Sequence, residues 1–166
     1  MKSQRDPTIF VMESKNLYGS RVDFLSHFEE GSDCKVKIIE HWVGFLGKKK
    51  LISDQIGKEI YGVALSDEKQ LREKKLSYLA SVETANLNQQ VLDFEYLNIP
   101  QGLYAKFENK GSAQKSSTLM DYVYGIWMPQ SDYRRARGYD FEIFDHRFAY
   151  NNPDSISFLC IPIELK

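Results

Sequence analysis

The feature that most constrains the fold is an amphipathic helix pattern that occurs twice, about 80 residues apart. In residues 35–50 the apolar side chains follow the spacing i, i+3, i+4 and i+7, at Ile39, Trp42, Val43 and Leu46. In residues 116–128 the same spacing returns at Leu119, Tyr122, Val123 and Ile126, and Trp127 extends it. Each pattern predicts a helix with one apolar stripe, which has to be buried against another element.

Short segments rich in β-branched and aromatic residues surround both predicted helices, for which Gly47 and Pro129 mark the expected ends. Such segments are typical of β-strands. Eight strands are predicted, at residues 8–12, 17–22, 60–65, 76–82, 92–97, 103–108, 139–148 and 156–163. The sequence therefore predicts an α+β fold.

The strands repeat as the helices do. The same offset pairs Tyr61 with Phe141 and Tyr78 with Phe158. We predict two pseudo-symmetric β-α-β-β units, at approximately 1–88 and 89–166, that form one antiparallel sheet within a single domain, 1–166. Because each helix has only one apolar stripe, both helices are expected on one face of the sheet, with an open ligand cleft on the other. A single domain also agrees with the length of the chain.

Charge and composition exclude several classes of function. The balance of 22 Lys and Arg against 23 Asp and Glu lacks the basic surface of a nucleic-acid-binding protein, so no direct nucleic-acid contact is expected. Cys34 and Cys160 are isolated, and His27, His41 and His146 have no metal-ligand spacing, so we expect no disulfide framework, metal or cofactor. The apolar runs are shorter than the ~20 residues that span a bilayer. We expect a cytoplasmic protein with no membrane contact.

The residue that points most clearly to chemistry is Glu142, in the predicted strand 139–148. Alternation along the strand would direct Phe141 and Ile143 towards the helices and Glu142 and Phe144 towards the other face. The counterpart of Glu142 in the first half is Gly62, and a glycine within a strand often marks the close approach of a ligand or of another backbone. Glu142 is therefore expected to face a gap.

Three interpretations of this glutamate are open from the residues alone. A carboxylate surrounded by aromatic rings can bind an organic cation, because ring faces attract positive charge. A buried glutamate can act as a general acid or base. It can also be a solvated carboxylate paired with an arginine. Ten Tyr beside ten Phe and two Trp are more hydroxyl-bearing rings than a core needs, which favours the first two interpretations.

Five short motifs follow one another along the chain: IIEHWVGF at 38–45, IYGV at 60–63, IPQGLYAKF at 99–107, YGIWMPQSDY at 124–133 and DFEIF at 140–144. From about Val36 onward they resemble the effector-binding domain shared by GyrI-like DNA gyrase inhibitory proteins and by the ligand-sensing half of some AraC-type and MerR-type regulators. The resemblance implies two β-α-β-β units and a central cleft that often binds lipophilic cations. Its glutamate corresponds to Glu142.

The resemblance also implies which aromatic residues line this cleft. By motif position they are Trp42, Tyr61, Tyr104 and Trp127, and the internal repeat adds Tyr78 and Phe158. Phe144 stands where the family motif has a tyrosine, so that hydroxyl is absent. Tyr122 and Tyr124 stand where many relatives have a further tryptophan, which is expected to reshape the floor of the cleft.

We therefore expect a protein that senses or sequesters an amphipathic, cationic organic compound, with Glu142 as the counter-charge. The thirty-odd residues before Val36 are too few for a helix-turn-helix beside the predicted strands, so a stand-alone form is expected. Some relatives hydrolyse toxins that contain a strained cyclopropane, and under this alternative Glu142 is the general acid or base. A third alternative is a protein-interaction module that inhibits gyrase or contacts the transcription machinery.

Overall fold

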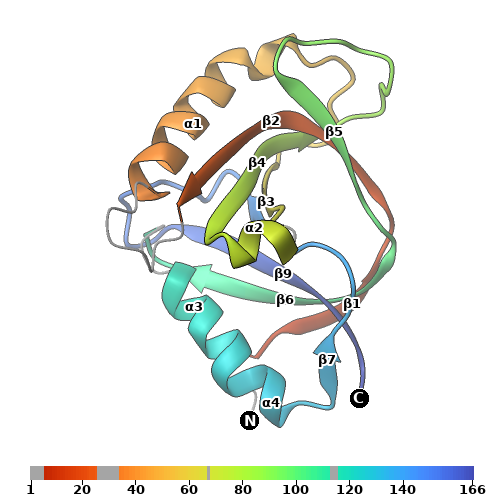
Figure 1. Ribbon diagram of the computed structural model, residues 1–166, viewed down its shortest axis with the longest axis vertical. Helices are drawn as coiled ribbons and strands as arrows, with labels where there is room; N and C mark the ends of the chain where they lie inside the picture. Colours follow the sequence, from red (N-terminus) through yellow and green to blue (C-terminus); the bar gives the residue numbers. More distant parts are fainter. Residues whose placement is uncertain (1–5, 26–33, 67, 113–115) are drawn as a thin grey trace. The chain divides into compact units, whose positions relative to one another are not determined.

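A computed structural model describes residues 6–25, 34–66, 68–112 and 116–166 of the chain (Figure 1). The described residues form mostly antiparallel strands together with two main helical segments, which confirms the α+β prediction. The chain divides into two units, each with its own hydrophobic core. We call Lys15–Ile99 the central unit, and the residues up to Ser14 together with Pro100–Lys166 the terminal unit.

The central unit is a four-stranded antiparallel sheet covered on one face by a helix (Figure 1). Its strands lie in the order β3-β4-β2-β5. In chain order its elements are β2 (Lys15–Leu25), α1 (Cys34–Lys48), a 3-10 turn (Lys49–Leu51), β3 (Ile60–Ala64), α2 (Glu68–Arg72), β4 (Lys75–Glu83) and β5 (Phe94–Ile99).

Helix α1 packs on this sheet through a different face from the one predicted. Phe45 is 2% exposed and belongs to the core, and Trp42 packs against the same core. Val43 and Leu46, which the spacing placed in the buried stripe, are 69% and 50% exposed. Since α1 carries apolar side chains on two sides, their spacing alone cannot decide which side faces the sheet.

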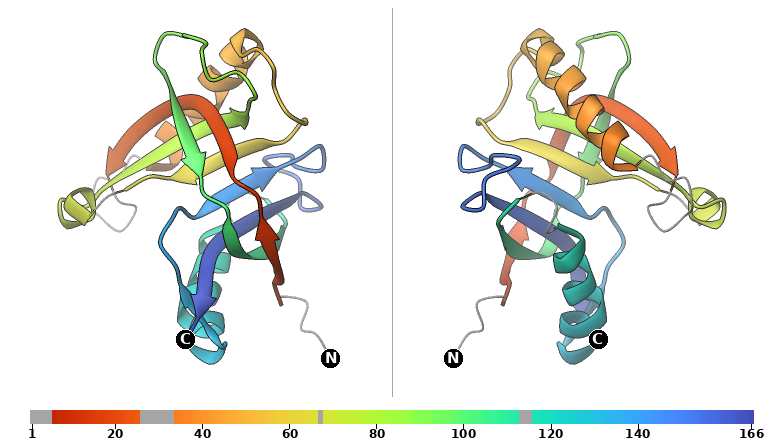
Figure 2. Two further views of the ribbon diagram at one scale, coloured as in Figure 1. Left: turned by 90° about the vertical axis from the view of Figure 1, so that its right-hand side faces the viewer. Right: turned by 90° about the vertical axis from the view of Figure 1, so that its left-hand side faces the viewer.

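The terminal unit also consists of antiparallel strands and a helical segment, and the C-terminus of the chain lies in it (Figure 2). Its strands lie in the order β1-β6-β9-β8, and β7 pairs with the end of β9. In chain order its elements are β1 (Thr8–Met12), β6 (Gly102–Lys110), α3 (Ser116–Tyr122), a π-helical turn (Val123–Trp127), α4 (Met128–Gln130), β7 (Tyr133–Arg135), β8 (Phe141–Phe144) and β9 (Ile156–Leu165).

The helical segment α3–α4 covers one face of the sheet of the terminal unit. Under it lies a core of Ala105, Phe107, Val123, Leu159, Ile161 and Ile163. The π turn holds more residues than an α turn, so the neighbouring residues Val123 and Tyr124 both pack on the sheet. Trp127 and Met128, which lie four residues further along the chain, also pack on it. Ile126, which the α-helical spacing placed in the stripe, is 49% exposed.

All eight predicted strands and both predicted helices are present, with altered ends. Strand β8 is shorter than predicted, because only Phe141–Phe144 pair with β9. The short elements α2 and β7 were not predicted. Pro129 lies inside the last helical turn, and the helix ends one residue later, at Gln130.

Candidate functional site

Glu142 lies on the face of the sheet that the helical segment covers. In the antiparallel register it stands opposite Leu159, which is part of the core under α3. Directly opposite residues share a face. Phe141 stands opposite Cys160 and therefore points to the other face. The prediction that Glu142 faces away from the helices is thus wrong, because β8 carries a large aromatic residue on each face and alternation could not orient it.

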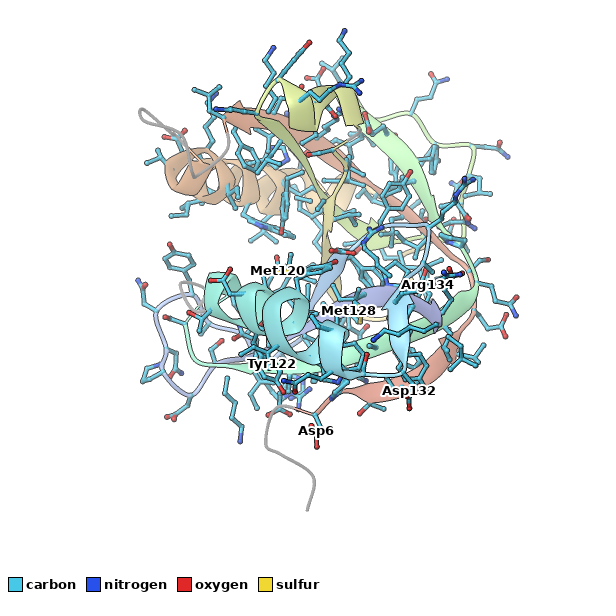
Figure 3. All side chains as sticks on the ribbon, turned by 60° about the horizontal axis from the view of Figure 1, so that its bottom comes forward. Asp6, Met120, Tyr122, Met128, Asp132 and Arg134 are labelled. Atoms are coloured by element: carbon cyan, nitrogen blue, oxygen red, sulfur yellow. The ribbon has the colours of Figure 1, made fainter. Side chains whose placement is uncertain are left out.

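Beside Glu142 lies a small cavity of about 10 Å³, also lined by Asn109, Leu119, Met120, Ser157, Phe158 and Leu159. This is about the space of one water molecule. Asn109 Nδ2 donates a hydrogen bond to Ser157 Oγ at 3.3 Å, and both residues are buried. The glutamate is therefore accompanied by an amide and a hydroxyl, while α3 closes the cavity with apolar side chains. Figure 3 shows Met120 and Tyr122 leaving α3 on opposite sides.

Two predicted aromatic residues share the helix-covered face with Glu142. Trp127 packs edge-on against Phe107, with ring centroids 5.0 Å apart. Phe144 follows Glu142 by two residues, is 8% exposed and contacts Phe148 at 4.6 Å between ring centroids. Of the predicted aromatic site residues in the terminal unit, Trp127 and Phe144 are the two whose rings lie on the face that carries Glu142.

Tyr104 and Phe158 lie on the opposite face of the same sheet. The ring of Tyr104 packs edge-on against Phe141 at 5.8 Å, its hydroxyl donates to the carbonyl oxygen of Pro100 at 2.9 Å, and burial raises the pKa of that hydroxyl. The ring of Phe158 lies under Lys106 Nζ at 5.1 Å. The rings of Tyr104 and Phe158 therefore lie on the face away from Glu142, although Phe158 is also one of the residues that line the cavity beside it.

Trp42, Tyr61 and Tyr78 belong to the central unit. Trp42 and Tyr78 meet edge-on on the face covered by α1, with ring centroids 6.1 Å apart. A Cβ added to Gly62 would lie 1.7 Å from the Tyr78 hydroxyl, so this glycine leaves room for a tyrosine side chain. Tyr61 points to the other face, since it pairs with Ser81, and Lys15 Nζ lies 5.8 Å from its ring.

The different placement of Tyr78 and Phe158 has a simple cause. Tyr61 is opposite Ser81 in one unit, and Phe141 is opposite Cys160 in the other. The separation in sequence between Ser81 and Cys160 is one residue smaller than the 80-residue offset. Because a shift of one residue moves a side chain to the other face of a sheet, Tyr78 and Phe158 cannot be equivalent.

Asn109, Ser157 and Met120 were not predicted as site residues. They come from β6, β9 and α3, and no local motif marks them. Only the pairing of β6 with β9, which sets Asn109 opposite Ser157, brings the two polar side chains beside the glutamate. In the described ranges no group of three His, Cys, Asp or Glu could hold a metal ion. No helix within those same ranges is long and apolar enough to cross a membrane.

Comparison with known proteins gives a family and a set of similar folds. The family described as GyrI-like small molecule binding domain matches residues 13–164. No curated protein sequence matches the chain.

Among solved structures, SAV2435 bound to tetraphenylphosphonium is 15% identical with a TM-score of 0.70, over 96% of this chain and 94% of that one. EcmrR in its complex with DNA is 10% identical with a TM-score of 0.70, over 98% of this chain and 59% of that one. A hydrolase encoded by lin2189 from Listeria innocua is 13% identical with a TM-score of 0.54, over 96% and 92%. These structures share the fold of the chain.

Proposed function

The chain belongs to the family of GyrI-like small molecule binding domains, and from this we propose that it binds a lipophilic organic cation with Glu142 as the counter-charge. The observation that carries the proposal is a half-buried carboxylate on the helix-covered face, among Asn109, Ser157 and the apolar side chains of α3. The tetraphenylphosphonium bound to SAV2435 supports the choice of a cation. We expect a protein that works in the cytoplasm.

The surroundings of Glu142 suit a lipophilic cation better than a small hydrated one. A carboxylate held away from bulk water attracts a cation more strongly than one in solvent does. Leu119 and Met120 offer apolar surface to the organic groups. A triaryl cation is much larger than the cavity of about 10 Å³, so α3 side chains have to move. Met120 suits this role, because methionine is unbranched and adapts its shape to its neighbours.

The pseudo-symmetric duplication is part of the same proposal. The strand order β3-β4-β2-β5 in the central unit corresponds element by element to β8-β9-β6-β1 in the terminal unit. In each unit a helix follows the third strand of that order along the chain. This helix packs on one face of the strands of its own unit. Under a duplication the equivalent of Glu142 is Gly62, so only the terminal unit would carry the charge.

The test uses two probes of nearly equal shape that differ in charge. Methyltriphenylphosphonium is a cation, and triphenylphosphine oxide is its neutral counterpart. We expect the wild-type protein to bind the cation at least about tenfold more tightly, and Glu142→Gln to remove this preference with little change for the neutral probe. Isothermal titration or Trp fluorescence measures both affinities. Equal loss for both probes, or no binding of either, contradicts the proposal.

Hydrolysis is a second candidate, favoured by the size of the cavity. A water molecule in it would meet Glu142, Asn109 and Ser157, and two to four polar partners are what a buried water needs. The glutamate would take a proton from this water as its oxygen bonds to one carbon of a strained cyclopropane, and would return that proton to the part of the molecule that receives the electron pair of the broken C–C bond. Incubation with a cyclopropane-containing toxin, followed by mass spectrometry, would show a gain of one water. Intact compound after prolonged incubation excludes this activity for that compound.

A further inference from the structure

Two side chains from separate segments of the terminal unit, one polar and one charged, meet at one carboxylate. The carboxylate is that of Asp140, the residue immediately before β8. Tyr124, in the π turn, donates its hydroxyl hydrogen to one carboxylate oxygen. Arg135, in β7, donates from Nε at 3.1 Å and from Nη2 at 3.0 Å to the other oxygen. Both oxygens of Asp140 are therefore engaged.

The carboxylate at the centre of this cluster is largely shielded from solvent, whereas the Arg135 side chain is 41% exposed. The side chain of Asp140 is only 13% exposed. Burial and the negative charge of Asp140 raise the pKa of the Tyr124 hydroxyl, which stays a donor. Arg135 also donates to the carbonyl oxygens of Ala136 and Gly138, at 3.1 and 2.9 Å. Hydrogen bonds thus connect the segment between β7 and β8 to the π turn, and further hydrogen bonds link residues within the segment.

The cluster connects the two elements that border the cavity beside Glu142. One side is α3, whose Leu119 and Met120 line the cavity and which runs directly into the π turn that holds Tyr124. The other side is β8, in which Glu142 follows Asp140 by two residues. Hydrogen bonds at Asp140 therefore fix where β8 begins relative to the helix.

We infer that Tyr124 and Arg135 are positioning residues, which hold Asp140 so that the Glu142 carboxylate stays in place for a bound cation. The inference rests on the proposed function. The π turn supports this inference, because the wider turn lets Tyr124 as well as Val123 face the sheet. π-helical turns occur frequently at functional sites in proteins.

Tyr124→Phe removes one hydroxyl and keeps the ring. If the hydroxyl positions Glu142, the variant should lose about three- to tenfold in affinity for methyltriphenylphosphonium and little for triphenylphosphine oxide. The matched control is Tyr18→Phe in the central unit, which also removes a buried hydroxyl, one that accepts from the backbone nitrogen of Val91 at 2.9 Å. The control should leave the ratio of the two affinities unchanged. A Tyr124→Phe protein with the wild-type ratio overturns the inference.

A double-mutant cycle with Glu142→Gln separates positioning from a general effect on folding. In the Glu142→Gln background, Tyr124→Phe should no longer change cation affinity, because there is no charge left to position. An equal loss in both backgrounds overturns the inference. Arg135→Gln is the second variant, and it should lower the cation preference in the same direction. If the wild-type protein and Glu142→Gln each bind the two probes with equal affinity, the proposed function itself fails. The positioning role then falls with it.

Discussion

Gly19 in β2 and Gly62 in β3 lie on the two strands that flank β4, but a methyl group at each would meet different obstacles. At Gly19 the added Cβ would lie 1.9 Å from the carbonyl oxygen of Ala80 and 2.6 Å from the Cα of Ser81, both of them backbone atoms. At Gly62 it would meet the end of the Tyr78 side chain, which can rotate away. Side-chain mobility therefore decides the cost of each substitution.

We expect Gly19→Ala to destabilise the protein by roughly 2–4 kcal/mol, because the β2–β4 pairing has to separate. Gly62→Ala should cost only about 1 kcal/mol and should move Tyr78 away from Trp42, which alters the fluorescence of that tryptophan. Urea unfolding monitored by circular dichroism measures both costs. Equal costs for the two variants would contradict this account of the packing.

Asp145 gives a prediction that depends on pH. Arg147 Nε donates to its two carboxylate oxygens at 3.0 and 3.1 Å, which lowers the pKa of Asp145 from 3.8 to about 2. The charged form is therefore favoured in the folded protein. Its contribution to stability is complete above pH 4 or so, falls as the pH drops from there towards 2, and is absent below that.

Asp145→Asn should consequently lower the unfolding temperature slightly at neutral pH and match the wild-type protein near pH 2. The effect is small because the pair lies at the surface. Arg147→Gln should give the same pH profile, since either change removes the ion pair. Thermal unfolding between pH 2 and 7 measures the difference. A gap between wild type and Asp145→Asn that stays constant over this range would show that the ion pair is not its cause.

At the scale of elements, helix α1 has an unusual glycine. Gly44 lies inside the helix, and a Cβ added to it would have no neighbour within 4 Å. Glycine in a helix interior costs ~0.5–1 kcal/mol relative to alanine, because the unfolded chain has more freedom to lose. Gly44→Ala should therefore raise the unfolding temperature by about 2–4 °C. Gly138→Ala is the contrasting variant and should lower it, since φ at Gly138 is +132°. Differential scanning calorimetry measures both changes, and an unchanged or lower value for Gly44→Ala contradicts the prediction.

The existence of the main strands and helices followed from the sequence, apart from the short elements α2 and β7, but the orientation of the elements did not. Periodicity locates a helix when apolar residues recur on it, yet α1 has a second apolar side, with Val43 exposed and Phe45 buried. The same limit applies to β8, where Phe141 and Phe144 are both buried although they lie on opposite faces. A pattern shows which face is buried only when the other face is polar.

The π turn is another case that local patterns could not reach. Residues 116–128 fit α-helical spacing well enough to predict the helix, but the widened turn leaves Ile126 exposed and lets Tyr124 face the sheet. For the candidate site, Glu142 could be predicted from a motif, and so could Trp127, which packs against the core on the same face of the sheet. Asn109 and Ser157 could not, because their proximity depends on the register of β6 against β9.

At the scale of the whole molecule, each unit contains one of the two tryptophans, Trp42 in the central unit and Trp127 in the terminal unit. Each tryptophan packs against the core of its own unit. Variants with a single tryptophan, Trp127→Phe and Trp42→Phe, therefore report the unfolding of one unit each. The prediction of a single domain, 1–166, then becomes measurable through the cooperativity of unfolding.

We expect fluorescence and circular dichroism to give coincident transitions within each single-tryptophan variant, because a single domain unfolds as one cooperative unit. Saturating methyltriphenylphosphonium stabilises only the folded protein, by about 2.7 kcal/mol at a hundred times its dissociation constant. If the chain unfolds as a whole, this gain should shift the transition seen by Trp42 as far as the one seen by Trp127, although Glu142 lies in the terminal unit. A shift confined to Trp127 would show that the two units unfold independently. The matched control is Glu142→Gln at the same probe concentration, in which both transitions should move less because the variant binds the cation more weakly.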